Sequence, residues 1–260
     1  MDVDCYLRRI GVDRPAEPDA EALARLHEAH LLAIPFENLS IAWGEPIVLD
    51  EVRLYRKIVD GRRGGGCYEL NALFAWGLRA LGYEVDVLSA RVWRETARFG
   101  PEYDHMCLRV RASGRDWLAD VGFGDSFRRP MVLEAGRSHA DGHAHYTLTH
   151  AGAGFELARR EDGASWIPQY RFDVVPRRLE EFAPMLSYHQ TSAEAPFTRR
   201  RVCSVATAWG RVTLTDRALV WTRLGGARTE EAIPDEAGWA AALRAHFGIE
   251  RPARGDRMRG

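Results

Sequence analysis

The sequence feature that most constrains the fold is a cysteine placed between a run of glycines and a helical pattern. Gly64, Gly65 and Gly66 precede Cys67, and apolar residues then recur at three- and four-residue steps as far as Leu81. This spacing puts the apolar side chains on one stripe of a helix, which a hydrophobic core must cover. Cys67 is therefore predicted at the N-terminus of a packed helix, where unpaired N–H groups and the positive end of the helix dipole favour a thiolate. The alternative is a small core cysteine beside a flexible loop.

The rest of the chain predicts helices before this cysteine and strands after it. A helix begins near Asp19, and Pro35 interrupts its period. After the cysteine helix, which Gly82 is predicted to end, alternating apolar and polar residues indicate antiparallel strands separated by glycine turns. The remaining predicted elements are strands in 83–88, 105–111, 117–121 and 146–149, a helix in 179–188, a hairpin of 211–214 with 218–222, and a final helix in 239–247.

Composition excludes several classes of protein. The 260 residues are 46% hydrophobic and 28% charged, which is ordinary for a globular protein. The formal net charge of −1 argues against a nucleic-acid surface, and no apolar run approaches the roughly 18 residues of a membrane span. We therefore expect neither nucleic acid nor a membrane as a partner. The four cysteines are scattered without a CxxC pair, so we expect no disulfide framework, no zinc finger and a cytoplasmic location.

A nucleophilic cysteine needs a base, and the base needs an orienting group. Among the nine histidines, His105 leads into a predicted hairpin that turns at 112–115 and returns through 117–121. In that hairpin His105 and Asp120 are opposite or diagonal neighbours, close enough for their side chains to touch. Asp120 lies in an otherwise apolar stretch, where a buried carboxylate is costly without a partner. Cys67, His105 and Asp120 are therefore candidates for a nucleophile, a base and an orienting carboxylate.

Other residues compete for chemical roles. Glu69 is a rival carboxylate, but on the helix it points off the face of the thiol, which suits a structural or capping role. The histidines between 139 and 150 invite a metal interpretation, yet their surroundings look like an exposed hairpin without a second ligand pair, so no metal is predicted. The loop from Gly122 to Ser126 has glycines that favour close approach of its backbone to a ligand, although a plain β-turn fits it equally well.

Together these motifs resemble the arylamine N-acetyltransferase family. The resemblance spans nearly the whole chain and is most specific around the cysteine. Its motifs follow the order of the family. They are Leu26-His27 and 34–39, the run from Arg63 to Asn71, Asp104-His105, the run from Asp120 to Gly124, and a later serine- and threonine-rich segment at 188–192 and Phe197-Thr198.

The resemblance implies an α+β fold. It consists of an N-terminal helical bundle, a central antiparallel β-barrel and a C-terminal α/β lid, around a core like those of papain-like cysteine proteases and transglutaminases. On this basis we expect a helical domain in 1–86 that carries the nucleophile and a β-barrel domain in 87–178 that carries the histidine and the aspartate. A linker helix in 179–198 and a lid in 199–260 follow.

The resemblance also implies an activity and a set of site residues. The enzyme would take an acetyl group from acetyl-CoA and transfer it to an arylamine or a hydrazine, without a metal. The candidate site residues are the catalytic triad Cys67, His105 and Asp120, the substrate-binding Phe36, Gly66 and Phe123, and the donor-binding Gly124, Asp125 and Ser126.

The chain departs from the family at the residue before the cysteine. The family usually has a bulky side chain there, whereas this chain has Gly66. The missing side chain leaves room for a larger ligand, unless the backbone needs a positive φ at this position. Some relatives are amide synthases that close a macrolactam from a polyketide on an acyl carrier protein, so that activity and that partner are an alternative. Two further alternatives are a cysteine hydrolase that uses the same triad, and a binding domain without catalytic activity.

Overall fold

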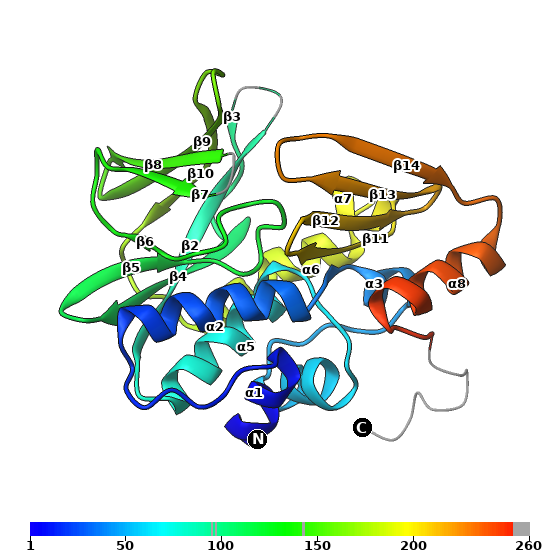
Figure 1. Ribbon diagram of the computed structural model, residues 1–260, viewed down its shortest axis with the longest axis horizontal. Helices are drawn as coiled ribbons and strands as arrows, with labels where there is room; N and C mark the ends of the chain where they lie inside the picture. The colour runs from blue at the N-terminus through cyan, green and yellow to red at the C-terminus, as the bar shows by residue number, and fades with distance from the viewer. Residues whose placement is uncertain (95, 97, 142–143, 252–260) are drawn as a thin grey trace.

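The computed structural model describes residues 1–251 with the exception of 95, 97, 142 and 143. The fold combines helices from the N-terminal part of the chain with two antiparallel sheets. Figure 1 shows the two sheets side by side above the first helices. The predicted α+β class is confirmed. The end of the predicted lid, 252–260, lies outside the described residues.

The first 80 residues are mainly helical. The helices are α1 (Val3–Ile10), α2 (Ala20–Ala33), α3 (Leu39–Trp43), α4 (Glu51–Tyr55), the π-helix η1 (Arg56–Asp60) and α5 (Cys67–Ala80). An aspartate precedes α1, α2 and α4, and its carboxylate accepts a backbone N–H of the first turn. The predicted helices that begin near Asp19 and at Cys67 are confirmed, and Gly82 has the left-handed backbone expected just after the end of α5. The sequence pattern does not predict α1, α3, α4 or η1.

The larger sheet is a nearly closed antiparallel barrel. Its strands lie in the order β6-β5-β4-β2-β10-β9-β8-β7, and β3 pairs with β2 outside that order. The strands are β2 (Glu84–Arg94), β3 (Arg98–Phe99), β4 (His105–Ala112), β5 (Arg115–Ala119), β6 (Met131–Val132), β7 (Ser138–Asp141), β8 (Ala144–Ala151), β9 (Gly154–Glu161) and β10 (Ile167–Asp173). The four predicted strands fall on β2, β4, β5 and β8. Buried side chains such as Leu88, Phe127 and Tyr170 fill the barrel.

The second antiparallel sheet takes strands from both ends of the chain. Its order is β1-β11-β12-β13-β14. Its elements are β1 (Phe36–Glu37), β11 (Val202–Thr207), β12 (Gly210–Thr215), β13 (Ala218–Arg223) and β14 (Arg228–Ala232), covered by α8 (Glu236–Phe247). The predicted hairpin is β12 with β13, and the predicted final helix is α8. Because β1 comes from the predicted helical domain, the division of the chain at 86, 178 and 198 remains a proposal.

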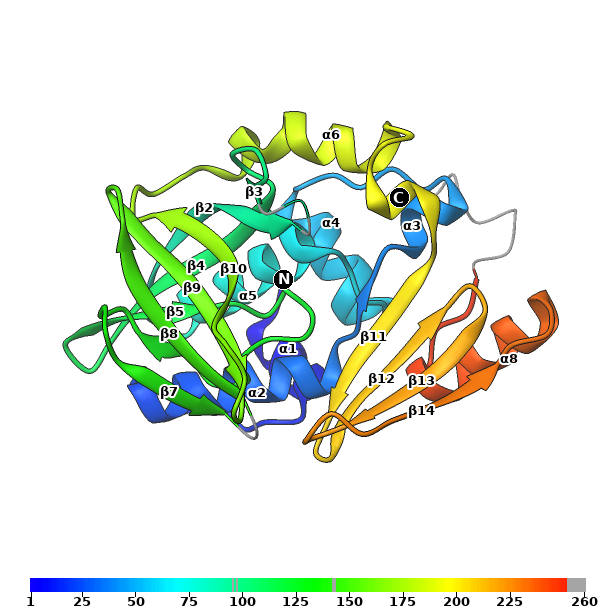
Figure 2. The same ribbon diagram turned by 90° about the horizontal axis from the view of Figure 1, so that it is seen from above.

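A helical segment connects the two sheets. It consists of η2 (Leu179–Phe182), α6 (Ala183–Thr191) and α7 (Pro196–Arg199), and it leads from β10 to β11. Figure 2 shows α6 running along one edge of the molecule, from the barrel toward the second sheet. Within the part of the chain that the structure describes, no helix has both the length and the apolar character that a membrane crossing requires.

Helix α5 lies at the centre of the largest core. It packs against β2 and β4 on one side and against α1 and α4 on the other, so its buried surface is wider than the single stripe predicted from the sequence. Gly77 lets α1 approach closely, because an added Cβ would lie 2.8 Å from Cε1 of Tyr6. That ring is fixed, since its hydroxyl forms a 2.9 Å hydrogen bond with Nδ1 of His30.

We expect Gly77→Ala to lower the free energy of unfolding by about 1–3 kcal/mol, because the new methyl group overpacks the contact with Tyr6. In an open helix the same exchange would instead stabilise the protein by up to about 1 kcal/mol. Gly238→Ala in α8 is the matched control, since its Cβ would come no closer than 3.4 Å to another group. Urea unfolding of the two variants measures both effects. Equal stabilisation by both would contradict the packing argument.

Candidate active site

Cys67 is the first residue of α5, with Gly66 as its N-cap in an extended conformation. The thiol is buried, as expected for a residue packed into the core. Glu69 caps the helix, because its carboxylate accepts the backbone N–H of Gly66 at 2.9 Å. The predicted capping role of Glu69 is confirmed. The nucleophile candidate is therefore held by the backbone and not by a mobile loop.

The three glycines before Cys67 serve different purposes. A Cβ on Gly64 would collide with the carbonyl of Pro35, and one on Gly65 would lie 2.7 Å from Cβ of Glu69. Gly66 is different, since the nearest group to its added Cβ is a carboxylate oxygen at 3.9 Å. Its φ is −76°, so the alternative that Gly66 needs a positive φ is wrong. This glycine leaves space beside the thiol without being required by the backbone.

A buried network of charges supports the start of α5. Lys57, the only lysine in the sequence, lies 2.7 Å from the capping carboxylate of Glu69 and 3.9 Å from Glu37. Glu37 in turn accepts hydrogen bonds from Arg63 at 3.0 Å and from the backbone N–H of Leu39 at 2.6 Å. Arg63, although close in sequence to Cys67, is thus neutralised by Glu37 and does not supply charge to the thiol.

His105 and Asp120 meet across the hairpin of β4 and β5. The observed register pairs Leu108 with Ala119, which sets His105 diagonally across from Asp120, as the hairpin geometry predicts. Nε2 of His105 lies 2.7 Å from Oδ2 of Asp120, and both side chains are buried. Because Nε2 is used by the aspartate, Nδ1 is the ring nitrogen left for the thiol.

Asp120 has partners on every side. Its other oxygen, Oδ1, accepts from Nδ2 of Asn71 at 3.0 Å and from the N–H of Gly122 at 2.9 Å. Its backbone N–H donates to Nε2 of His27 at 3.0 Å. Asn71 lies on α5 and His27 on α2, so the carboxylate joins the helical part of the chain to the barrel.

The charge on Asp120 controls the protonation of His105. Burial acts to lower the pKa of His105, but the negative charge of Asp120, their hydrogen bond and the nearby Cys67 outweigh burial and raise that pKa to about 10. In the opposite sense, burial acts to raise the pKa of Asp120, but His105, Asn71 and the Gly122 N–H hold it below its usual value. His105 is therefore protonated, and it lines the same cavity as Cys67.

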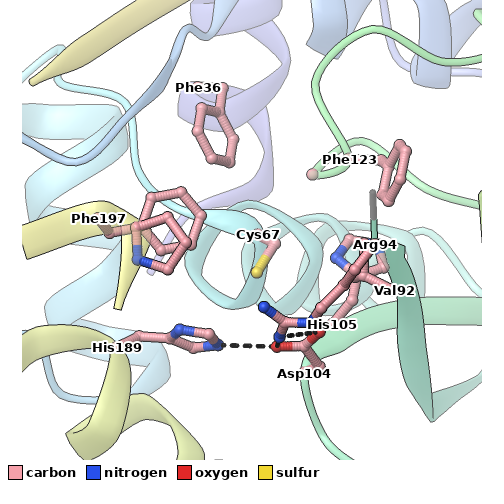
Figure 3. A pocket seen from close by; sticks show the side chains of 11 residues that line it. Phe36, Cys67, Val92, Arg94, Asp104, His105, Phe123, His189 and Phe197 are labelled. Atoms are coloured by element: carbon pink, nitrogen blue, oxygen red, sulfur yellow. Dashed lines mark hydrogen bonds and ion pairs between the residues drawn. The ribbon is translucent and has the colours of Figure 1, made fainter. Parts of the chain in front are cut away.

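The thiol opens into an aromatic cavity of about 240 Å³. Figure 3 shows the sulfur of Cys67 pointing into it, with Phe36 and Phe197 nearby. Phe36 and Phe123, predicted from the resemblance to bind substrate, both line this cavity. Gly66 lies on an adjoining cavity that shares Phe36, Cys67, His189 and Phe197 with the first. The complete lining of the first cavity is Phe36, Cys67, Val92, Arg94, Asp104, His105, Gly122, Phe123, His189, Pro196 and Phe197.

The glycines of the loop after Asp120 have a structural reason. A Cβ on Gly122 would lie 2.7 Å from Cα and from the carbonyl oxygen of Cys67 and from Nδ2 of Asn71. At Gly122 the loop approaches the backbone of the nucleophile, and Gly122 also lines the catalytic cavity. The approach of this backbone to a ligand stays a prediction. Gly124 has a left-handed φ of +95°, which favours glycine on conformational grounds.

The predicted donor contacts lie apart from the catalytic cavity. The carbonyl of Gly124 accepts a hydrogen bond from Arg211, and the carboxylate of Asp125 pairs with Arg159 at 3.0 Å. Asp125 and Ser126 line a small separate cavity of about 70 Å³ between the barrel and β12. These three residues follow Phe123 directly, and their role toward the donor stays a prediction.

The histidines between 139 and 150 were considered above as possible metal ligands. Across residues 1–251 with the stated gaps, no three His, Cys, Asp or Glu side chains gather as metal ligands. His145 lies 2.9 Å from Asp162 on the surface of the barrel. His143 is outside the described residues.

Sequence reasoning gave no role to Asn71 and His27, which orient Asp120. A signal was present in both cases, because Asn71 is a polar residue among apolar neighbours on α5, and His27 and His30 lie on the otherwise apolar buried face of α2. Burial lowers the pKa of His27 to about 4, so its ring is neutral and Nε2 can accept the N–H of Asp120. Its Nδ1–H then donates to the carbonyl of Arg128 at 2.7 Å.

Comparisons with known proteins place the whole chain beside one family. A family model described as N-acetyltransferase matches residues 19–254. The arylamine N-acetyltransferase of Mycolicibacterium smegmatis is 37% identical, over 96% of this chain and 92% of that protein. The structure of the arylamine N-acetyltransferase from Salmonella typhimurium superposes with a TM-score of 0.91 at 30% identity, covering 98% of this chain and 93% of that one. The structure of the Mycobacterium marinum arylamine N-acetyltransferase in complex with CoA superposes with a TM-score of 0.88 at 31% identity, covering 95% of this chain and 93% of that one.

We expect Asp120→Asn to shift the pH profile of Cys67 alkylation by iodoacetamide to higher pH. The aspartate charge is what raises the pKa of His105, while burial lowers it. Without that charge the imidazole loses its proton at lower pH, and the thiolate loses its cationic partner in the neutral range. Acyl transfer should fall by a factor on the order of 10⁴, as in other triads.

The matched control is Asp116→Asn in β5, the strand that ends just before Asp120. Asp116 pairs with Arg111 near the surface and does not contact His105, so its removal should leave the alkylation profile where it is. A profile that is unchanged in Asp120→Asn would show that another group orients His105.

Proposed function

Because the chain belongs to the arylamine N-acetyltransferase family and is therefore an acyltransferase, we propose that it transfers an acetyl group through a thioester on Cys67 to the nitrogen of an arylamine or a hydrazine. The observation that carries the proposal is the 2.7 Å contact between His105 and Asp120, next to a thiol at a helix N-terminus in an aromatic cavity. This arrangement supplies a nucleophile, a base and an orienting carboxylate.

In the first half of the cycle the Cys67 thiolate attacks the carbonyl carbon of the donor thioester. The tetrahedral intermediate carries a negative oxygen. The backbone N–H of Cys67, which has no partner within the helix because it lies at the start of α5, is a suitable donor to that oxygen. The bond from carbon to the sulfur of CoA then breaks. The leaving thiolate takes the proton from His105, and the acetyl group remains on Cys67.

In the second half the acceptor amine attacks the acetyl-enzyme. His105, now neutral, accepts the proton of the amine, and Asp120 stabilises the imidazolium that forms. The carbon–sulfur bond breaks, and Cys67 returns as the thiolate beside protonated His105. Exchange between thioesters is nearly balanced, whereas formation of the amide is strongly favourable, so the second half drives the cycle.

Acetyl-CoA is the proposed donor, in line with the CoA complex of the Mycobacterium marinum relative. A larger cavity of about 680 Å³ shares Phe36, Phe123 and Phe197 with the catalytic cavity. It continues along the second sheet past Arg200 and Arg217, whose cationic side chains suit the phosphates of CoA. We place the pantetheine arm in this larger cavity, and keep Gly124, Asp125 and Ser126 as predicted contacts near Phe123.

The aromatic lining favours a flat acceptor. Phe36, Phe123 and Phe197 present ring faces and edges to a ligand beside the thiol, as an arylamine requires. Macrolactam closure from an acyl carrier protein remains the alternative, although the cavity beside Gly66 measures only about 30 Å³. A hydrolase would use the same triad without needing an amine.

With acetyl-CoA and no acceptor, mass spectrometry of the wild-type protein should show one added acetyl group, located on Cys67. Cys67→Ala should show none while keeping its circular dichroism spectrum. The other cysteines serve as internal controls. Burial raises the pKa of the Cys107 and Cys203 thiols well above its ordinary value, and neither they nor Cys5 should be labelled. Label on any of them would overturn the nucleophile assignment, and steady release of acetate without an amine would indicate a hydrolase.

Gly66 should decide how large an acceptor can be. Gly66→Ala should retain activity, because its Cβ meets nothing closer than 3.9 Å. Gly66→Phe fills the space beside the thiol and should reduce kcat/KM for aminonaphthalene by at least about 10-fold more than for aniline. Gly65→Ala is the control for backbone disturbance, since its Cβ would press on Glu69 and should affect both amines alike. An equal loss for both amines in Gly66→Phe would contradict a role in substrate size.

A further inference from the structure

Part of the catalytic cavity wall is polar, in contrast to its phenylalanines. Arg94 from the end of β2, Asp104 from the loop before β4 and His189 from α6 line the same cavity as Cys67. Figure 3 shows the three side chains in a row, with Asp104 between Arg94 and His189. Neither the acyl transfer chemistry nor the fold gives a role to this row.

The charges in the row cancel each other. Nη2 of Arg94 donates to both carboxylate oxygens of Asp104 at 2.8 Å. The Asp104 side chain is 4% exposed, whereas that of Arg94 is 39% exposed and lies toward solvent. The ion pair therefore gives the cavity wall polarity without net charge.

His189 is the member of the row with unused hydrogen-bonding capacity. Its ring packs between Tyr68 and Phe197, with centroid distances of 5.9 and 5.5 Å, and the residue is 6% exposed. Neither ring nitrogen has a hydrogen-bond partner among the residues that the structure describes. The nearest carboxylate oxygen, Oδ1 of Asp104, lies 3.6 Å from Nε2, beyond hydrogen-bond distance. Burial lowers the pKa of His189 and outweighs the charge and the backbone of Asp104, which act to raise it, so the ring is neutral and offers one donor and one acceptor.

We propose that His189 selects acceptors that carry a neutral hydrogen-bonding substituent, such as a phenolic hydroxyl, on the aromatic ring. The inference rests on the proposed function, since it concerns the acceptor of the same cavity. A buried polar group without a partner is costly, so a ligand that supplies the missing hydrogen bond binds better. A hydroxyl can donate and accept, and it therefore suits either tautomer of His189. A methyl group leaves both nitrogens unpaired.

The test compares aminophenols with the corresponding methylanilines, in both meta and para pairs. The quantity measured is the hydroxyl-to-methyl ratio of kcat/KM. The reference is the hydroxyl-to-methyl rate ratio of the same amines in their uncatalysed reaction with a simple acetyl thioester. In at least one pair, the ratio for the wild-type protein should be larger than this reference. His189→Phe keeps an aromatic ring but no polar atom, and it should lower the ratio about 5- to 10-fold. His189→Asn keeps a donor and an acceptor and should retain most of the preference.

Tyr188→Phe is the matched control. It removes a polar group from the neighbouring position of α6, on a side chain that is 37% exposed and outside the cavity lining, and its ratio should equal that of the wild type. If His189→Phe does not fold, His189→Leu carries the same comparison. A wild-type ratio no larger than the uncatalysed one in both pairs, or a ratio that His189 variants leave unchanged, would overturn the inference. Absence of acetylation for every amine would overturn the proposed function itself.

Discussion

The buried carboxylate of Asp120 is the group on which both the packing of this chain and its chemistry depend. It takes hydrogen bonds from His105 on β4 and from Asn71 on α5, and its backbone N–H reaches His27 on α2. A carboxylate that lost these partners inside the protein would be costly. The folded state therefore has to bring the two helices and the barrel together around it. Orientation of the base at the active site follows from the same requirement.

How far the sequence predicts this structure depends on how local the determining contacts are. The start of α5 at Cys67 and the pairing of His105 with Asp120 could be predicted, because one follows from helix periodicity and the other from a short hairpin. Contacts between distant segments could not. The pairing of Phe36 with Ser204 leaves no local pattern in the sequence. The hydrogen bond of His27 to Asp120 leaves only a polar residue on a largely apolar helix face. The short helices α3 and η1 likewise lack enough turns to show a period.

Gly66 shows a second limit on what can be predicted from the sequence. A sequence cannot distinguish a glycine required by the backbone from one that only leaves space, since the letter is the same. Here Gly64 and Gly65 are confined by Pro35 and Glu69, whereas Gly66 has ordinary backbone angles and open space beside it. The neighbouring charges of Lys57, Arg63 and their glutamates are all turned toward one another. As a result, the cavity wall near Gly66 carries little unpaired charge, and it selects a ligand mainly by its size and shape.

The strand β1 has a consequence for how such a protein can change during evolution. Its two residues pair with β11 in the second sheet, while Phe36 also bridges to Gly65 just before the nucleophile. The same two residues thus supply an edge of the second sheet, an aromatic wall of the cavity and, through Glu37, part of the charge network under α5. Recombination that exchanged only the C-terminal sheet between relatives would separate these roles. The C-terminal sheet is consequently not a self-contained module, because one of its edges is supplied by the N-terminal part of the chain.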